Sequence, residues 1–122
     1  MPELITTPHR VPVPGGKVID EFVGLASTGT EGVSVAVMSA PPGWDEPAQR
    51  PDFDEVTVVL DGEVVLEHDG GSIRVPAGQA VLTRAGERVR YSVGPGGARY
   101  VAVCLPAFSP QTVHREDEED AR

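Results

Sequence analysis

Short apolar runs alternate with turn residues between Phe53 and Val93. The runs are rich in β-branched residues and are too brief for helices, but they have the length of strands. Pairs such as Asp61-Gly62 and Ala85-Gly86 predict that the chain turns back after each run. A glycine recurs every eight residues, at Gly62, Gly70, Gly78, Gly86 and Gly94. This regular spacing predicts consecutive antiparallel strands, as in a sandwich, a jelly roll or a barrel.

The flanking segments predict further strands and one polar loop. Residues 17–25 are typical of an edge strand, residues 33–40 of an inner strand, and residues 98–105 of a closing strand. A polar loop at 44–54 lies between them and carries several chemically active side chains. We expect one barrel domain at 17–114, an extended proline-rich arm at 1–16, and an acidic, disordered tail at 115–122.

Composition narrows the class of protein. The 122 residues suffice for one domain, and 12 prolines with 14 glycines leave no room for a long interior helix. The formal net charge is −9, and the basic residues form no stripe, so we expect no nucleic-acid partner. A single cysteine excludes an internal disulfide. The sequence shows no targeting segment or membrane span, so we expect a cytoplasmic protein without a membrane partner.

Two sets of spaced residues resemble the two motifs of the cupin family. The first motif reads glycine, five residues, His-x-His, three or four residues, glutamate, six residues and glycine. The second reads glycine, five residues, Pro-x-Gly, two residues, histidine, three residues and asparagine. The corresponding residues are Gly43, Gln49, Pro51, Glu55 and Gly62 for the first motif, and Gly78, Arg84, Gly86, Val89 and Val93 for the second. The resemblance implies an all-β cupin fold, a double-stranded β-helix or jelly-roll barrel of two antiparallel sheets.

The resemblance also implies which side chains face the interior of the barrel. The cupin pattern places Glu55 inside, and side chains alternate between the two faces of a strand. Counting from Glu55, and from Val89 in the second motif, gives the expected inner face, while Arg88 and Arg90 are expected to face outwards. The inward sets are Glu55, Thr57 and Val59; Val89, Tyr91 and Val93; and Tyr100, Ala102 and Cys104.

The same resemblance bears on a metal cofactor. Cupin metals are held by the two histidines and the glutamate of the first motif and by the histidine of the second. Three of these four positions are Gln49, Pro51 and Val89 here, and proline and valine side chains offer no donor atom. We therefore expect no metal cofactor, and a metal-dependent, dioxygenase-like enzyme is the least favoured alternative.

The C-terminal part resembles ectoine synthases, cupin enzymes that cyclise an acetylated diamino acid by loss of water. Residues 101–117 align with the end of that family, with matches at Val101, Val103, Pro106, Val113, His114, Glu116 and Asp117. Of the positions that are functional in that family, only Glu55 and His114 are kept. The resemblance implies the same barrel with a different or lost chemistry.

These observations predict a small-molecule site in the barrel cavity. The catalytic candidates are Glu55, Tyr91 and His114, with Glu55 as the acid–base group, because burial raises the pKa of a carboxyl. The candidates for substrate binding are Gln49, Thr57, Cys104 and Trp44. The sequence favours a metal-independent lyase, cyclase or isomerase. A non-catalytic binding or sensing cupin is the alternative.

Each candidate also has a purely structural interpretation. Glu55 could form a buried pair with Tyr91 or Arg50, and His114 could cap the barrel. Cys104 has the properties of a small buried hydrophobe, and Trp44 those of a lid or dimer contact.

We also expect a homodimer. The arm alternates apolar residues at Val11 and Val13, so it can lie along a sheet edge of its own chain or of a neighbouring subunit. The strand at 18–23 would otherwise leave an unpaired sheet edge.

Overall fold

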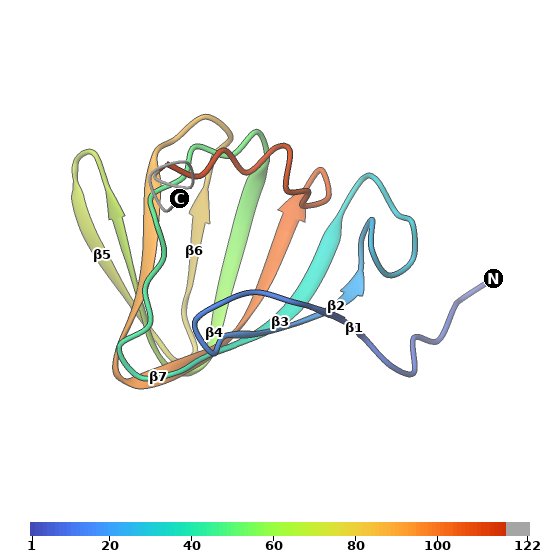
Figure 1. Cartoon of the computed structure of the whole chain (residues 1–122), viewed down its shortest axis with the longest axis horizontal. Helices are drawn as coiled ribbons and strands as arrows, with labels where there is room; N and C mark the ends of the chain where they lie inside the picture. The colour runs from blue at the N-terminus through green and yellow to red at the C-terminus, as the bar shows by residue number, and fades with distance from the viewer. Residues whose placement is uncertain (117–122) are drawn as a thin grey trace.

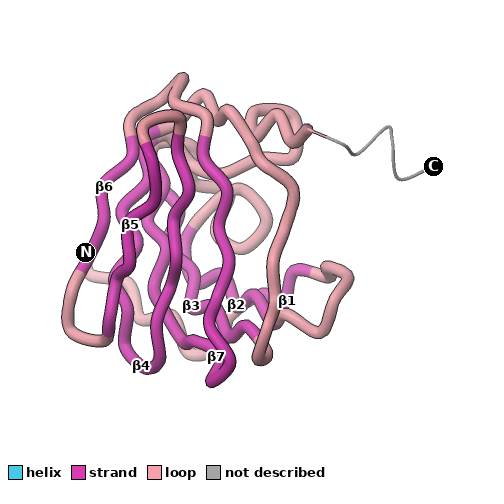
Figure 2. Tube along the Cα trace, turned by 90° about the vertical axis from the view of Figure 1, so that its left-hand side faces the viewer, coloured by secondary structure: helices cyan, strands magenta, loops and turns pink. Residues whose placement is uncertain are grey.

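The computed structural model describes residues 1–116, and this part of the chain contains seven β-strands and no helix (Figures 1 and 2). The all-β prediction is confirmed. The strands are β1 (His9–Val11), β2 (Val18–Val23), β3 (Ser34–Ala40), β4 (Asp54–His68), β5 (Gly71–Pro76), β6 (Ala80–Thr83) and β7 (Val89–Leu105). Nor does the described part of the chain hold a helix long and apolar enough to span a lipid bilayer.

The two long strands, β4 and β7, connect the two sides of the barrel. All pairings are antiparallel, in the order β1-β2-β3-β7-β4-β5, with β6 also paired to β4. The first part of β4 pairs with the end of β7 and with β6, whereas its second part pairs with β5 and the start of β7. The β4–β7 register shifts between Val59 and Asp61 and again between Gly62 and Val64. Such bulges bend a strand and allow it to pass from one sheet to the next.

Two segments without regular strands extend the side of the barrel that contains the start of β7. The loop after β3 runs along the start of β7, where Gln49 and Val89 exchange backbone hydrogen bonds of 2.8 and 2.9 Å. The C-terminal segment runs along the other edge of this loop, and the amide of Glu116 donates to the carbonyl of Ala48 at 2.7 Å. The polar loop expected at 44–54 is therefore part of the barrel wall.

The five regularly spaced glycines occupy two kinds of position, turns and strand interiors. Gly70, Gly78 and Gly86 lie in turns, as predicted, but Gly62 and Gly94 lie inside β4 and β7. The predicted turn at Asp61-Gly62 is therefore wrong. Gly62 has a φ of 77°, and the strand continues through a bulge because the backbone of β7 approaches it closely there.

Alternate residues of β4 and β7 fill the core. Val59 and Leu66 of β4 are 1% and 2% exposed, and they pack in one cluster with Val89 and Tyr91 of β7. A second cluster holds the side chains of Phe53, Cys104, Val113 and Phe108. All three sets of side chains predicted to face inwards are buried.

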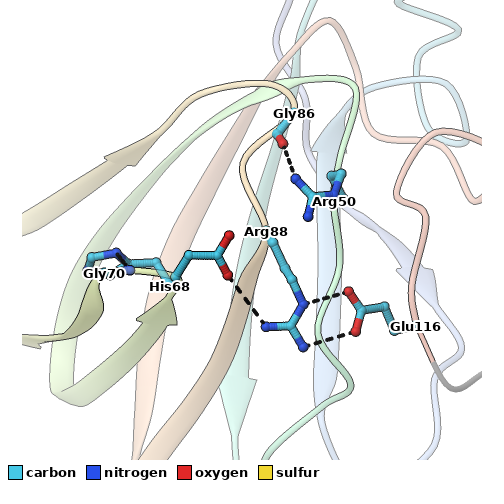
Figure 3. A network of polar contacts seen from close by, with 7 residues as sticks. Arg50, His68, Gly70, Gly86, Arg88 and Glu116 are labelled. Carbon is cyan, nitrogen blue, oxygen red and sulfur yellow. Dashed lines mark hydrogen bonds and ion pairs between the residues drawn. The ribbon is translucent and has the colours of Figure 1, made fainter.

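The N-terminal arm belongs to the same sheet as the barrel. β1 pairs with β2, so the arm takes the first of its two expected places, on an edge of its own sheet, and β1 replaces β2 as the edge strand. Val11 and Val13 line the chain's own cavity. Of the predicted acidic tail, only Arg115 and Glu116 are described. The Glu116 carboxylate accepts two hydrogen bonds from Arg88, at 2.7 and 3.0 Å (Figure 3). The remainder, 117–122, lies outside the described residues.

Candidate functional site

A cavity of about 80 Å³ lies inside the barrel, with side chains of the arm, β2, β3 and β7 in its wall. Most of its wall is apolar, with Val11, Val13, Ile19, Met38, Ala102 and Phe108 among the contributors. Its polar groups include Lys17, Glu21, Glu46, Gln49, Glu55, Tyr91 and Arg115. An apolar cavity with a few converging polar groups is the usual form of a small-molecule site.

Glu55 is the buried carboxyl of this cavity. It follows the start of β4, where strand alternation turns its side chain inwards, and it is 8% exposed. Burial raises its pKa to about 7, and the nearby Glu46 carboxylate adds to the increase. Lys17, Tyr91 and Arg115 act in the opposite direction. Glu55 can therefore both donate and accept a proton near neutral pH.

The Tyr91 hydroxyl lies close to Glu55, Thr57 and Thr83 but makes no well-formed hydrogen bond with residues 1–116. Within the described residues this buried oxygen meets no group at hydrogen-bond geometry, and the same holds for the hydroxyl of Thr57. Burial and the Glu55 carboxyl raise the pKa of Tyr91 well above its usual value, although Thr57 and Thr83 lie beside the phenol and partly oppose the increase. Buried polar atoms are normally paired, so a ligand hydrogen bond would complete this hydroxyl.

Three charged residues stand beside Glu55. The ammonium nitrogen of Lys17 lies 4.1 Å from the centroid of the Trp44 ring and 5.5 Å from that of Tyr100. Burial lowers the pKa of Lys17. Arg115 contacts a carboxylate oxygen of Glu46 at 3.5 Å. The sequence analysis missed Lys17, Glu46 and Arg115 as candidates, and the one available signal was that Lys17 is the single lysine of the chain.

Four predicted site residues line the cavity together: Gln49, Glu55, Tyr91 and Cys104. Gln49 is 4% exposed, and its side-chain oxygen accepts a hydrogen bond from Arg115 at 3.4 Å. Burial, with a contribution from Glu55, raises the pKa of Cys104 far above its usual value. Its thiol therefore stays protonated, as expected of a buried hydrophobe.

The other three predicted residues lie elsewhere. Thr57 is 1% exposed and does not line the cavity. Trp44 is buried at 9% and lines a neighbouring hollow of about 170 Å³, which shares Lys17, Glu46 and Arg115 with the main cavity.

His114 does not line the cavity, in contrast to its expected place beside Glu55. Its ring nitrogen Nε2 lies 2.7 Å from a carboxylate oxygen of Asp52, and both side chains are exposed. The physical reason is local. His114 has a φ of 50°, and its carbonyl accepts the amide of Arg50, so the segment lies flat on the loop.

The residues present do not fit a divalent metal of the cupin type. Glu55 is the one carboxylate at the family's ligand positions, and Gln49 is already bonded to Arg115. No group of three or more His, Cys, Asp or Glu residues in the described chain is arranged to hold an ion. The cations Lys17 and Arg115 act on Glu55 and would further disfavour a metal ion there.

A curated relative covers most of this chain. The Endoribonuclease YbeY of Myxococcus xanthus is 50% identical over 107 residues, which are 87% of this chain. The chain spans only 36% of the length of that relative.

Solved structures share the fold at low sequence identity. An oxalate decarboxylase variant from Bacillus subtilis superposes with a TM-score of 0.78, at 17% identity, over 97% of this chain and 33% of the other. A Rhizobium leguminosarum protein of unknown function gives a TM-score of 0.63, at 22% identity, over 76% and 84% of the two chains. These likenesses support the barrel and do not extend to a reaction.

Residues 36–104 match the family described as the Cupin domain. The match runs from β3 to the end of β7 and includes both long strands with their bulges. The chain is therefore a member of the cupin family.

Proposed function

We propose that this cupin binds a small metabolite in its barrel cavity and that Glu55 acts there as the acid–base group of a metal-independent lyase, cyclase or isomerase. One observation carries the proposal: a buried carboxyl with a pKa of about 7 faces a largely apolar cavity. Burying an ionised carboxylate without a partner is costly, so the presence of Glu55 in an apolar cavity favours a functional role for this residue.

The chemistry follows from the protonation states of the cavity. The Glu55 carboxylate can take a proton from a bound molecule, and the resulting acid can return it to another atom of that molecule. Tyr91 stays protonated, because its pKa is raised, and its hydroxyl can donate a hydrogen bond to a developing oxyanion. His114 lies outside the cavity, so Tyr91 is the partner that the proposal uses.

A non-catalytic binding or sensing role is the second candidate. It is favoured by the raised pKa values of Tyr91 and Cys104, which keep both side chains protonated at neutral pH, so that neither can serve Glu55 as a partner base or as a nucleophile. A metal-dependent reaction is disfavoured by the donor set around Glu55.

The likeness to the Myxococcus relative does not support a nuclease activity for this chain. This chain spans 36% of that protein, and its net charge of −9 opposes binding to a phosphate backbone. We therefore propose a metabolite, and not RNA, as the ligand.

A binding screen tests the proposal. Pools of small metabolites are added to the protein at pH 7, and ligand-observed NMR detects both binding and conversion. Hits should bind the wild type and lose binding or turnover with Glu55→Gln. Glu63→Gln is the matched control, because Glu63 lies on the same strand but pairs with Arg74 at the surface, at 2.7 Å. Equal binding and turnover by all three proteins would contradict a role for Glu55.

A further inference from the structure

Charged groups in the cavity wall are unequally paired. Arg115 has two partners, the Glu46 carboxylate, which neutralises its charge at 3.5 Å, and the Gln49 side-chain oxygen, which accepts a hydrogen bond from it at 3.4 Å. The carboxylate of Glu21, which also lines the cavity, accepts hydrogen bonds from the amides of Ala26 and Ser27, at 3.1 and 2.9 Å. These groups have their partners within the chain.

Lys17 differs from them. Across residues 1–116 its ammonium group forms neither a hydrogen bond nor an ion pair, and its contacts are the ring faces of Trp44 and Tyr100. Glu46 and Glu55 act on it only through longer-range electrostatics. Ring faces attract a cation, but they accept no hydrogen bond from its three protons as a carboxylate oxygen does.

The rings also fix the position of the ammonium group. Lys17 borders both the main cavity and the neighbouring hollow, so its charge is accessible from the space that a ligand would occupy. A cation that is held in place, largely removed from water and without a counter-ion is a recognition group for an anion.

We infer that the ligand is a small organic acid with a short apolar chain, and that its carboxylate takes Lys17 as its counter-ion. This inference rests on the proposed use of the cavity and adds the class of ligand. The apolar part of such an acid fits the walls formed by Ile19, Met38 and Ala102. A single negative charge suits the site, since a multiply charged anion would be repelled by Glu46 and by the ionised form of Glu55.

The single tryptophan gives a direct readout. Trp44 lies under the Lys17 ammonium group, so its fluorescence and its indole N–H resonance report events at that nitrogen. Butyrate, butyramide and butylamine have similar chains and differ in the charge of the head group. We expect butyrate to shift both Trp44 signals in a saturable way. The neutral amide and the cationic amine should not do so at the same concentrations.

Substitutions then test whether the charge of Lys17 is the one that binds butyrate. Lys17→Met should weaken butyrate binding at least tenfold, measured by ligand-observed NMR. Arg10→Met removes the same charge from an exposed position, where Arg10 pairs with Asp20 at 2.7 Å, and should leave binding unchanged. Lys17→Gln is a second variant with a polar head group, and circular dichroism checks the fold of each. If both Lys17 variants unfold, the Trp44 titration of the wild type with the three probes tests whether the site selects the carboxylate.

The remaining outcomes separate this inference from the proposed function. Binding of butyramide or butylamine as tight as that of butyrate would overturn the inference while leaving a ligand-binding cavity. Butyrate binding that is unaffected by Lys17→Met would overturn it as well. If none of the three probes binds the wild type, the inference falls, and the metabolite screen with Glu55→Gln decides the proposed function independently.

Discussion

The backbone carbonyl oxygen of Gly97 lies 2.1 Å from the point that a Cβ atom on Gly62 would occupy. β4 and β7 therefore approach each other at their bulges more closely than any side chain at position 62 allows. Real Cβ atoms do not come this near to a backbone oxygen, so a side chain there would force the two strands apart.

We expect Gly62→Ala to destabilise the protein by about 3 kcal/mol or more, because it adds a backbone clash to an unfavourable φ. Gly86→Ala is the matched control. Gly86 has a φ of 87° with open space around it, so this substitution should cost only about 1 kcal/mol. Urea unfolding measures both, and equal losses would contradict a specific clash at residue 62.

The stability of the protein should depend on pH through Glu55. Its pKa is raised from 4.5 when unfolded to about 7 when folded, so the folded state keeps a proton that the unfolded state releases. Stability from this group is complete below pH 4.5, declines as the pH rises to 7, and stays low above that. The loss amounts to about 3 kcal/mol.

Glu55→Gln removes this titration. The difference in unfolding free energy between wild type and variant, measured in urea from pH 4 to pH 8, isolates Glu55 from the other acids. The variant should be at least as stable as the wild type at pH 8. A variant that is unfolded at both ends of the range would show a structural role for the carboxylate.

Cys104 should be unreactive in the folded protein. Its thiol is buried at 4% exposure and its pKa is raised, so little thiolate is present at pH 8. Iodoacetamide should modify the native protein slowly and the urea-unfolded protein quickly. Because the chain has one cysteine, mass spectrometry gives an unambiguous count. Rapid modification of the native protein would show that the cavity admits the reagent to the thiol.

Self-association remains a prediction, although its structural argument has changed. β2 is covered by β1, and Val11 and Val13 face the chain's own cavity, so the outer edge of β1 is the candidate contact. Light scattering at micromolar concentration should give the mass of a dimer. A clean monomer mass would contradict this prediction, as would unchanged association after deletion of residues 1–14.

Local patterns in the sequence were sufficient to predict most of the strands. The cupin pattern placed Glu55 inside the barrel, and alternation along the strands then placed Tyr91 and Cys104 correctly, because strand periodicity is a property of neighbouring residues. The bulge at Gly62 was predicted as a turn, since glycine suits either structure and only the approach of Gly97, thirty-five positions away, distinguishes them.

The missed part of the site depends on long-range contacts. Lys17 becomes a site residue only when Trp44 and Tyr100 lie beneath it, and no local pattern shows that arrangement. His114 was expected at the site because it matches a family position. Its side chain instead pairs with Asp52, because the backbone at His114 has a positive φ that the family pattern does not encode.

The two cations of the cavity come from nearly opposite ends of the described chain, Lys17 before β2 and Arg115 after β7. Trimming by a carboxypeptidase back to His114 would therefore leave all the described strands intact and still remove one of these two cations from the cavity. Ligand binding would then respond to proteolysis at the C-terminal side sooner than the fold does.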